Sequence, residues 1–120
     1  MSTREPLSTI GQPVPELPVE DVERAQQYYR DVLGFEIGWL NPGKEIGAVS
    51  RGDAVIFFRR TRSPFAPAVH WVFAEDLDAS YNELKSSGAR IVEPLAEKPW
   101  GMRQFTVDDL DGNRFYFHHD

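Results

Sequence analysis

The chain contains no cysteine, so disulfide bridges, thiolate zinc sites and cysteine nucleophiles are all excluded. No apolar run approaches the ~20 residues of a membrane span, and the N-terminal residues lack the apolar stretch of a secretory signal. Basic residues are also scarce, since 13 Lys and Arg stand against 19 Asp and Glu, a net charge of −6. Nucleic-acid affinity depends on neutralising phosphates, so this deficit argues against such a partner. We expect a cytoplasmic protein with no membrane or nucleic-acid partner.

The composition that remains is that of an ordinary folded domain. Of 120 residues, 41% are hydrophobic and 27% are charged, which is typical neither of disordered nor of fibrous chains. A chain of this length buries roughly 65% of the surface that its unfolded form exposes, enough for one core. We therefore expect a single domain over residues 1–120.

The sequence contains an internal repeat. Val-Glu-Asp-Val-Glu at residues 19–23 matches Ala-Glu-Asp-Leu-Asp at residues 74–78, and residues 52–58 parallel residues 112–118. Such self-similarity indicates two copies of one structural unit. A polar stretch interrupted by prolines separates them, so we expect repeat one at 13–61, a linker at 62–67 and repeat two at 68–119. The first twelve residues are expected to form a mobile arm.

Each repeat predicts one helix among four strands. Apolar residues recur every three or four positions over residues 22–33 and 77–84, with Asp21 and Asp76 as N-caps and glycines at the ends. Strands are expected at residues 14–19, 35–39, 45–50 and 55–60 in the first repeat, and at 68–74, 90–94, 102–107 and 114–119 in the second. The predicted fold class is α+β, built from two βαβββ units.

The order of these motifs resembles the vicinal oxygen chelate superfamily, which contains glyoxalase I, extradiol dioxygenases, fosfomycin resistance proteins and bleomycin-binding proteins. The resemblance spans residues 12–119. It rests on Leu-Pro-Val-Glu-Asp at residues 17–21, on the helix segment 25–35, on Asp-Leu-Asp-Ala at 76–79 and on Asp-Leu-Asp-Gly-Asn at 109–113. It implies that the two repeats form one curved, eight-stranded open barrel whose concave face holds the ligand, with the helices packed outside.

Catalytic members of that family hold a divalent metal with His, Gln or Glu side chains on the inner face. Three of the corresponding positions here are Val14, Val69 and Tyr116. None of these side chains can ligate a metal as an imidazole or a carboxylate would. His70 lies one residue past an expected ligand position, and a shift of one residue on a strand turns a side chain toward the helices. We therefore expect no metal, no cofactor and no catalytic residue.

Strand alternation predicts which side chains line the concave face. When the more apolar positions are assigned to the helix side, Glu16, Trp71, Tyr116 and His118 point inward, and we assign Phe57 to the same face. Aromatic rings beside a carboxylate suit flat ligands that are cationic or heteroaromatic. The same rings could also simply fill the barrel.

Trp100 lies in a Lys-Pro-Trp-Gly loop, where a large apolar side chain has little packing role unless it covers a cleft. Residues 99–105 resemble the Trp-Gly-x-Arg-Glu-Phe segment of the bleomycin-binding branch, with Gln104 in place of the usual Glu. The resemblance implies an acidic, metal-free dimer that sequesters a cationic drug without catalysis. The candidate ligand-binding residues are Glu16, Trp39, Phe57, Trp71, Trp100, Arg103, Tyr116 and His118.

Three functional hypotheses follow. The first is stoichiometric sequestration of a cationic or heteroaromatic small molecule, an antibiotic-resistance role that resembles bleomycin resistance proteins. The second is a metal-dependent lyase or isomerase resembling glyoxalase I, or a dioxygenase-like member, with His70 and His118 as rearranged ligands. The third is an interaction module whose barrel is filled. Because an open barrel leaves sheet edges exposed, we expect a homodimer, with the segment bearing Pro13 and Pro15 exchanged between chains.

Overall fold

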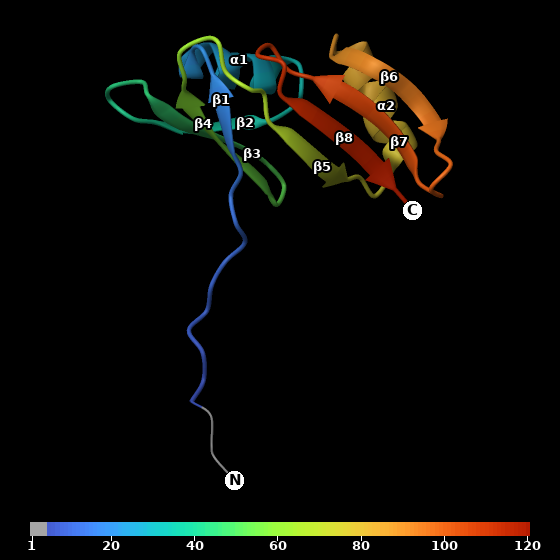
Figure 1. The fold of residues 1–120 in the computed structure, drawn as a ribbon, viewed down its shortest axis with the longest axis horizontal. Helices are drawn as coiled ribbons and strands as arrows, with labels where there is room; N and C mark the ends of the chain where they lie inside the picture. The colour runs from blue at the N-terminus through green and yellow to red at the C-terminus, as the bar shows by residue number, and fades with distance from the viewer. Residues whose placement is uncertain (1–4) are drawn as a thin grey trace.

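Four strands and one helix make up each half of the chain in the computed structural model, which describes residues 5–120 (Figure 1). The first half contains β1 (Glu16–Val19), α1 (Val22–Asp31), β2 (Glu36–Leu40), β3 (Ile46–Arg51) and β4 (Ala54–Arg60). The second half contains β5 (Val69–Phe73), α2 (Leu77–Ser86), β6 (Arg90–Glu97), β7 (Arg103–Asp108) and β8 (Arg114–His119). The predicted α+β class is confirmed, and both halves have the same order of elements.

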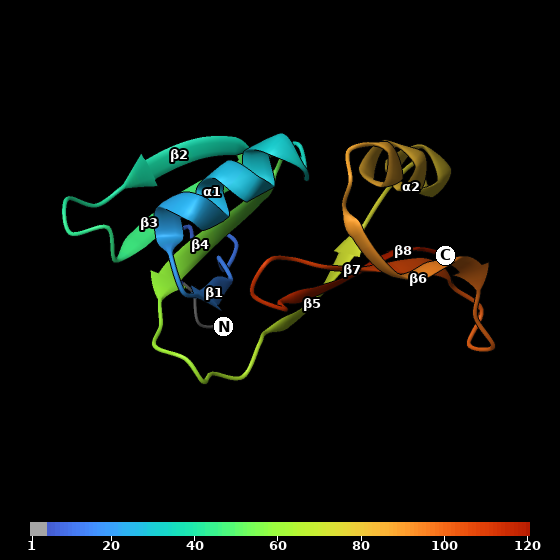
Figure 2. The same ribbon diagram turned by 90° about the horizontal axis from the view of Figure 1, so that it is seen from above.

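The strands form two separate sheets, with the orders β1-β4-β3-β2 and β5-β8-β7-β6. In both sheets the edge strand, β1 or β5, is parallel to its neighbour, and the other pairs are antiparallel. The sheets lie side by side, with α1 and α2 on the same side of them (Figure 2). The expectation of one eight-stranded barrel within the chain is therefore wrong, because in residues 5–120 no ladder of hydrogen bonds joins the two sheets.

Both helices begin and end where local chemistry predicts. The carboxylates of Asp21 and Asp76 accept backbone N–H bonds at 3.0 Å from the third residue after each cap. Gly34 and Gly88 follow the helices with φ values of 74° and 90°, a conformation that side chains with a Cβ rarely adopt. No helix within residues 5–120 combines the length and hydropathy needed to cross a membrane.

The core lies between each helix and one face of its sheet. Alternate strand positions are buried on that face, among them Leu17, Val19, Phe58, Val107 and Phe115. This register confirms which face of each sheet meets its helix, since strand side chains alternate. The opposite face of each sheet, which we call the open face, carries the remaining positions.

The turn between β7 and β8 fastens the two halves together. Asp109 is 1% exposed and accepts a 2.6 Å hydrogen bond from the hydroxyl of Tyr29 on α1. Asn113 donates to the carbonyl of Pro18 at 2.9 Å and accepts from the backbone N–H of Ala68 at 2.8 Å. The Asp-Leu-Asp-Gly-Asn segment therefore binds α1, β1 and the residue before β5, and further hydrogen bonds within the turn hold the Asp109 carboxylate in place.

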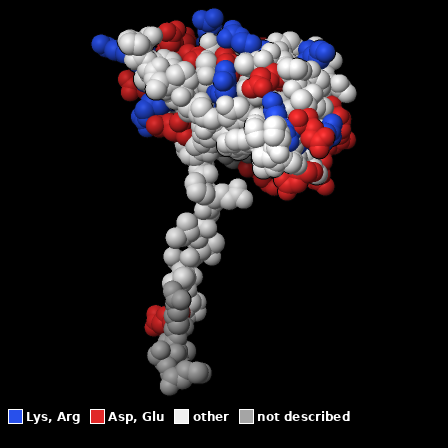
Figure 3. All heavy atoms as spheres, turned by 45° about the vertical axis from the view of Figure 1, so that its right-hand side comes forward, with Lys and Arg blue, Asp and Glu red and all other residues white. Residues whose placement is uncertain are grey.

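Residues 5–15 form no helix or strand and leave the folded part as an extended segment (Figure 1). Its large apolar side chains are open to solvent, with Leu7 75%, Ile10 87% and Val14 39% exposed. In the view of Figure 3 acidic and basic side chains are mixed over the folded part, while the segment is mostly uncharged. The first four residues of the predicted arm lie outside the described residues, and its mobility stays a prediction.

Candidate ligand-binding site

The open face of the second sheet carries a row of uncovered apolar side chains. Val69, Trp71 and Phe73 follow one another at alternate positions of β5 and are 56%, 54% and 56% exposed. Large apolar groups that gather on one surface usually mark a binding or association surface. Two clusters of predicted site residues lie on the open faces, one on each sheet.

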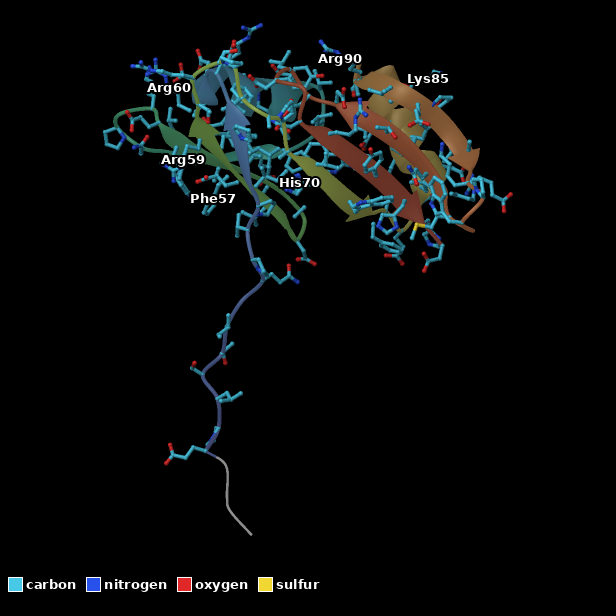
Figure 4. The ribbon with its side chains drawn as sticks, viewed as in Figure 1. Phe57, Arg59, Arg60, His70, Lys85 and Arg90 are labelled. Carbon is cyan, nitrogen blue, oxygen red and sulfur yellow. The ribbon has the colours of Figure 1, made fainter. Side chains whose placement is uncertain are left out.

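The first cluster is on the first sheet. The rings of Trp39 and Phe57 pack edge to face, with centroids 5.1 Å apart. Strand register places Glu16 beside Phe57, so Glu16 lies on the open face as alternation predicts. Its carboxylate, however, accepts a 2.7 Å hydrogen bond from the guanidinium of Arg59, two residues after Phe57 on the same face (Figure 4). The acidic group expected to attract a cation is therefore already matched by a positive charge.

The second cluster combines three predicted residues. The rings of Trp71 and Tyr116 are 4.7 Å apart and tilted by 36°, and the His118 ring meets Trp71 edge-on at 5.7 Å. Beside them Arg114 donates to Asp108 at 2.8 and 3.1 Å. These bonds to Asp108, together with a bond to Tyr116, raise the pKa of Arg114. The cluster thus presents an exposed aromatic surface whose nearest charges are paired.

Two candidates lie away from these clusters. Arg103 donates two hydrogen bonds, at 2.8 and 3.1 Å, to Asp78 in the first turn of α2. Its position on β7 alternates with that of Gln104, so its side chain points to the helix side and not to the open face. Trp100, in the loop between β6 and β7, is 61% exposed, and its ring packs against no other aromatic ring of residues 5–120.

A cavity of about 590 Å³ lies where the two halves meet. Its lining is mostly apolar and comes from α1, the β3–β4 turn, residues 12–15, β5 and β8. Among the predicted site residues only Trp71 borders it. Sequence reasoning missed this cavity because it depends on how the two units meet, which no local pattern reports.

His70 borders the same cavity, at the junction of β5 with the first half (Figure 4). Its ring stacks on Phe115 at 5.9 Å, on the helix side of the sheet, as alternation predicts. Burial lowers the pKa of His70, and its Nδ1 atom has no hydrogen-bond partner among the described residues. His118 faces the opposite side with Trp71, so the two histidines do not converge.

The donor set on the open faces does not fit a divalent metal. Val14 and Val69, which stand at two family ligand positions, are exposed apolar side chains, and Tyr116 packs on Trp71. Within residues 5–120 no three His, Asp or Glu side chains gather as a metal site requires.

Solved structures share this architecture. TioX from Micromonospora sp. ML1 is 29% identical, with a TM-score of 0.76 over 91% of this chain and 98% of that chain. The bleomycin-binding protein of bleomycin-producing Streptomyces verticillus, complexed with copper(II)-bleomycin, is 26% identical, with a TM-score of 0.75 over 92% and 97%. A superfamily member from Sphaerobacter thermophilus DSM 20745 is 24% identical, with a TM-score of 0.74 over 92% and 98%.

Comparison with protein-family models identifies the family of the chain. No curated protein matches the chain. The model of one protein family matches residues 9–117, nearly the whole length. The chain therefore belongs to the glyoxalase/bleomycin resistance protein/dioxygenase superfamily.

Proposed function

We propose that this protein sequesters a flat heteroaromatic small molecule on the open face of its second sheet, without transforming it. The observation that carries the proposal is the half-exposed Trp71 ring beside Tyr116, because this aromatic surface is not used to build the core. A planar ligand would stack on Trp71 and gain about 0.5–1.5 kcal/mol beyond the burial of its area. The copper(II)-bleomycin complex of the Streptomyces verticillus protein supports the same class of function.

The paired charges favour a heteroaromatic ligand over a simple cation. Glu16 is bonded to Arg59 through one oxygen, and Asp108 is bonded to Arg114 through both, so an arginine offsets the negative charge of each carboxylate. A cation would therefore gain less from either carboxylate than from one with no arginine beside it. The metal-dependent alternative through His70 and His118 has no support here, because the two rings lie on opposite faces of one sheet.

We also propose that the working form is a homodimer. The β5 row of Val69, Trp71 and Phe73 is more than half exposed, and the extended segment presents Leu7 and Ile10 to solvent. A second copy, with its residues 5–15 exchanged, would cover this apolar area and bring the first sheet of one chain to the second sheet of its partner. Eight strands would then surround each ligand, which one chain alone does not achieve.

Calorimetric titration of the full chain tests the proposal. Bleomycin and a panel of neutral and cationic flat heteroaromatic compounds would be titrated into the wild type and into Trp71→Ala. We expect saturable binding of at least one compound and an affinity loss in the variant of at least about 2- to 12-fold, because Trp71→Ala removes the stacking energy above together with the contact area of the ring. Binding of none would refute sequestration of this ligand class. Binding that Trp71→Ala leaves unchanged would place the site elsewhere.

A further inference from the structure

The open face of the second sheet contains polar atoms that the fold leaves without partners. They are Gln104 Oε1, Thr106 Oγ1 and His118 Nδ1, and none has a hydrogen-bond partner among the described residues. Gln104 is 3% exposed and Thr106 is 0% exposed. Buried polar atoms are nearly always paired in native proteins, because an unpaired one loses its bonds to water without replacement. Three in one place indicate a missing partner.

These three groups are neighbours on a single face. Gln104 on β7 lies opposite His118 on β8, and Thr106 lies opposite Tyr116 in the same register. Residues two apart on a strand share a face, so Gln104 and Thr106 are adjacent along β7. We call Gln104, Thr106 and His118 the polar floor. Trp71 stands beside it, with its ring 5.7 Å from that of His118.

The charged groups around the polar floor are already paired. Asp108, two residues after Thr106, binds Arg114. Glu93, opposite Thr106 on β6, accepts a 3.0 Å hydrogen bond from the ammonium of Lys98. The floor itself offers an amide, a hydroxyl and an imidazole, and each of these groups can both donate and accept hydrogen bonds. It therefore suits a neutral polar group better than an ion.

We infer that the polar floor binds the lactam or carboxamide edge of a neutral heteroaromatic ring that stacks on Trp71. An amide edge carries one N–H donor beside one C=O acceptor. Gln104 and Thr106 are covered in the ligand-free fold, so binding requires the side chains above them to move aside; the Gln104 amide oxygen can then accept from the N–H and the Thr106 hydroxyl can donate to the C=O, while the ring covers the aromatic surface. This inference rests on the proposed function and deepens it, since it names the chemistry that selects one flat ligand from another.

Three bicyclic probes and two variants of the full chain test the inference. The probes are 2-quinolone, which has the lactam edge, naphthalene, which lacks it, and N-methylquinolinium, which is cationic. Thr106→Val removes only the unpaired hydroxyl, and Gln104→Met removes the amide at similar volume. The matched control is Thr61→Val, because the Thr61 hydroxyl donates to the Arg59 carbonyl outside the polar floor.

We expect the wild type to bind 2-quinolone about tenfold more tightly than naphthalene, the upper range for one net hydrogen bond. Thr106→Val and Gln104→Met should each reduce this preference about two- to tenfold, and Thr61→Val should leave it unchanged. Thr106→Val should melt at the same temperature as the wild type or higher, since it deletes a buried group that has no partner in the protein.

Each other outcome overturns the inference in a recognisable way. Equal affinities for 2-quinolone and naphthalene, with no effect of either variant, would show that the polar floor does not select the ligand. The proposed function would not be affected by this result. A lower melting temperature of Thr106→Val with unchanged 2-quinolone affinity would show that the Thr106 hydroxyl bonds to an ordered water, which stabilises the fold, and that it does not bind the ligand. Preference for N-methylquinolinium would show that the site selects charge. Binding of no probe, and of none of the broader panel, would refute the proposed function as well.

Discussion

The hydrogen bond between Tyr29 and Asp109 should contribute strongly to stability, and Tyr29→Phe isolates it. Both residues are 1% exposed, and the hydroxyl donates to the carboxylate at 2.6 Å. The variant keeps the ring, which packs on Phe58 at 4.7 Å, so it removes little apolar contact. Hydrogen bonds to charged groups contribute about 1.5–3 kcal/mol, so we expect Tyr29→Phe to lower the free energy of unfolding by about 2 kcal/mol.

The same variant should change the pH dependence of stability at alkaline pH. Burial, and then the charge and hydrogen bond of Asp109, raise the pKa of Tyr29 well above its ordinary value of 10.0. The unfolded chain therefore loses this proton before the folded chain does. The stability that Tyr29 contributes is fully present below pH 10 and is lost as the pH rises toward the pKa of the folded state. The gap between wild type and Tyr29→Phe should then shrink above pH 10.

Urea unfolding followed by tryptophan fluorescence measures both effects at one fixed protein concentration, at pH 7, 9 and 10.5. For a chain of this length 2 kcal/mol corresponds to a fall of about 8 °C in melting temperature. Tyr81→Phe is the matched control, because no hydrogen bond of the Tyr81 hydroxyl occurs within residues 5–120, and it should change stability by less than about 0.5 kcal/mol. A loss below about 0.5 kcal/mol in Tyr29→Phe, or a gap that widens with pH, would refute the reasoning.

Three further predictions test the faces, the assembly and the cavity. Phe58→Ala should cost about 3–5 kcal/mol in chemical unfolding and Phe57→Ala less than about 2, because Phe58 is 0% exposed in the core and Phe57 lies on the open face; equal costs, or a larger cost for Phe57→Ala, would contradict the face assignment. Deletion of residues 1–12 should convert a sedimenting dimer into a monomer, and a wild type that is already monomeric at micromolar concentration would contradict the homodimer. Burial lowers the pKa of His70, so as the pH falls the unfolded chain binds a proton at this imidazole before the folded chain does. The free energy of unfolding should therefore decrease as the pH falls below 6.5. In urea unfolding, His70→Asn should show a smaller decrease than the wild type. An unchanged acid slope in His70→Asn would show that the ring is solvated in solution.

The local elements, and the side of the sheet that each strand residue faces, follow from the order of residues alone. Asp21 and Asp76 cap their helices because a short carboxylate reaches the free N–H groups two or three residues on, whatever the rest of the chain does. Alternation along a strand is equally local, so Glu16, Trp71 and His118 were assigned to the open face correctly. No helix or strand forms over residues 62–67, and their role as a linker between repeats stays a prediction.

Which side chains come into contact depends on the packing of elements that are far apart in the sequence. That Arg59 neutralises Glu16, and that Asp78 holds Arg103 on the helix side, depends on strands and helices that are distant in sequence. The sequence also could not predict that the strands form two separate sheets, because the repeat specifies the structure of each unit but not the contact between the units. The polar floor shows the same limit, since Gln104, Thr106 and His118 read as ordinary strand residues until β7 and β8 are in register. Local patterns are fixed by backbone geometry, whereas a binding site is fixed by long-range packing.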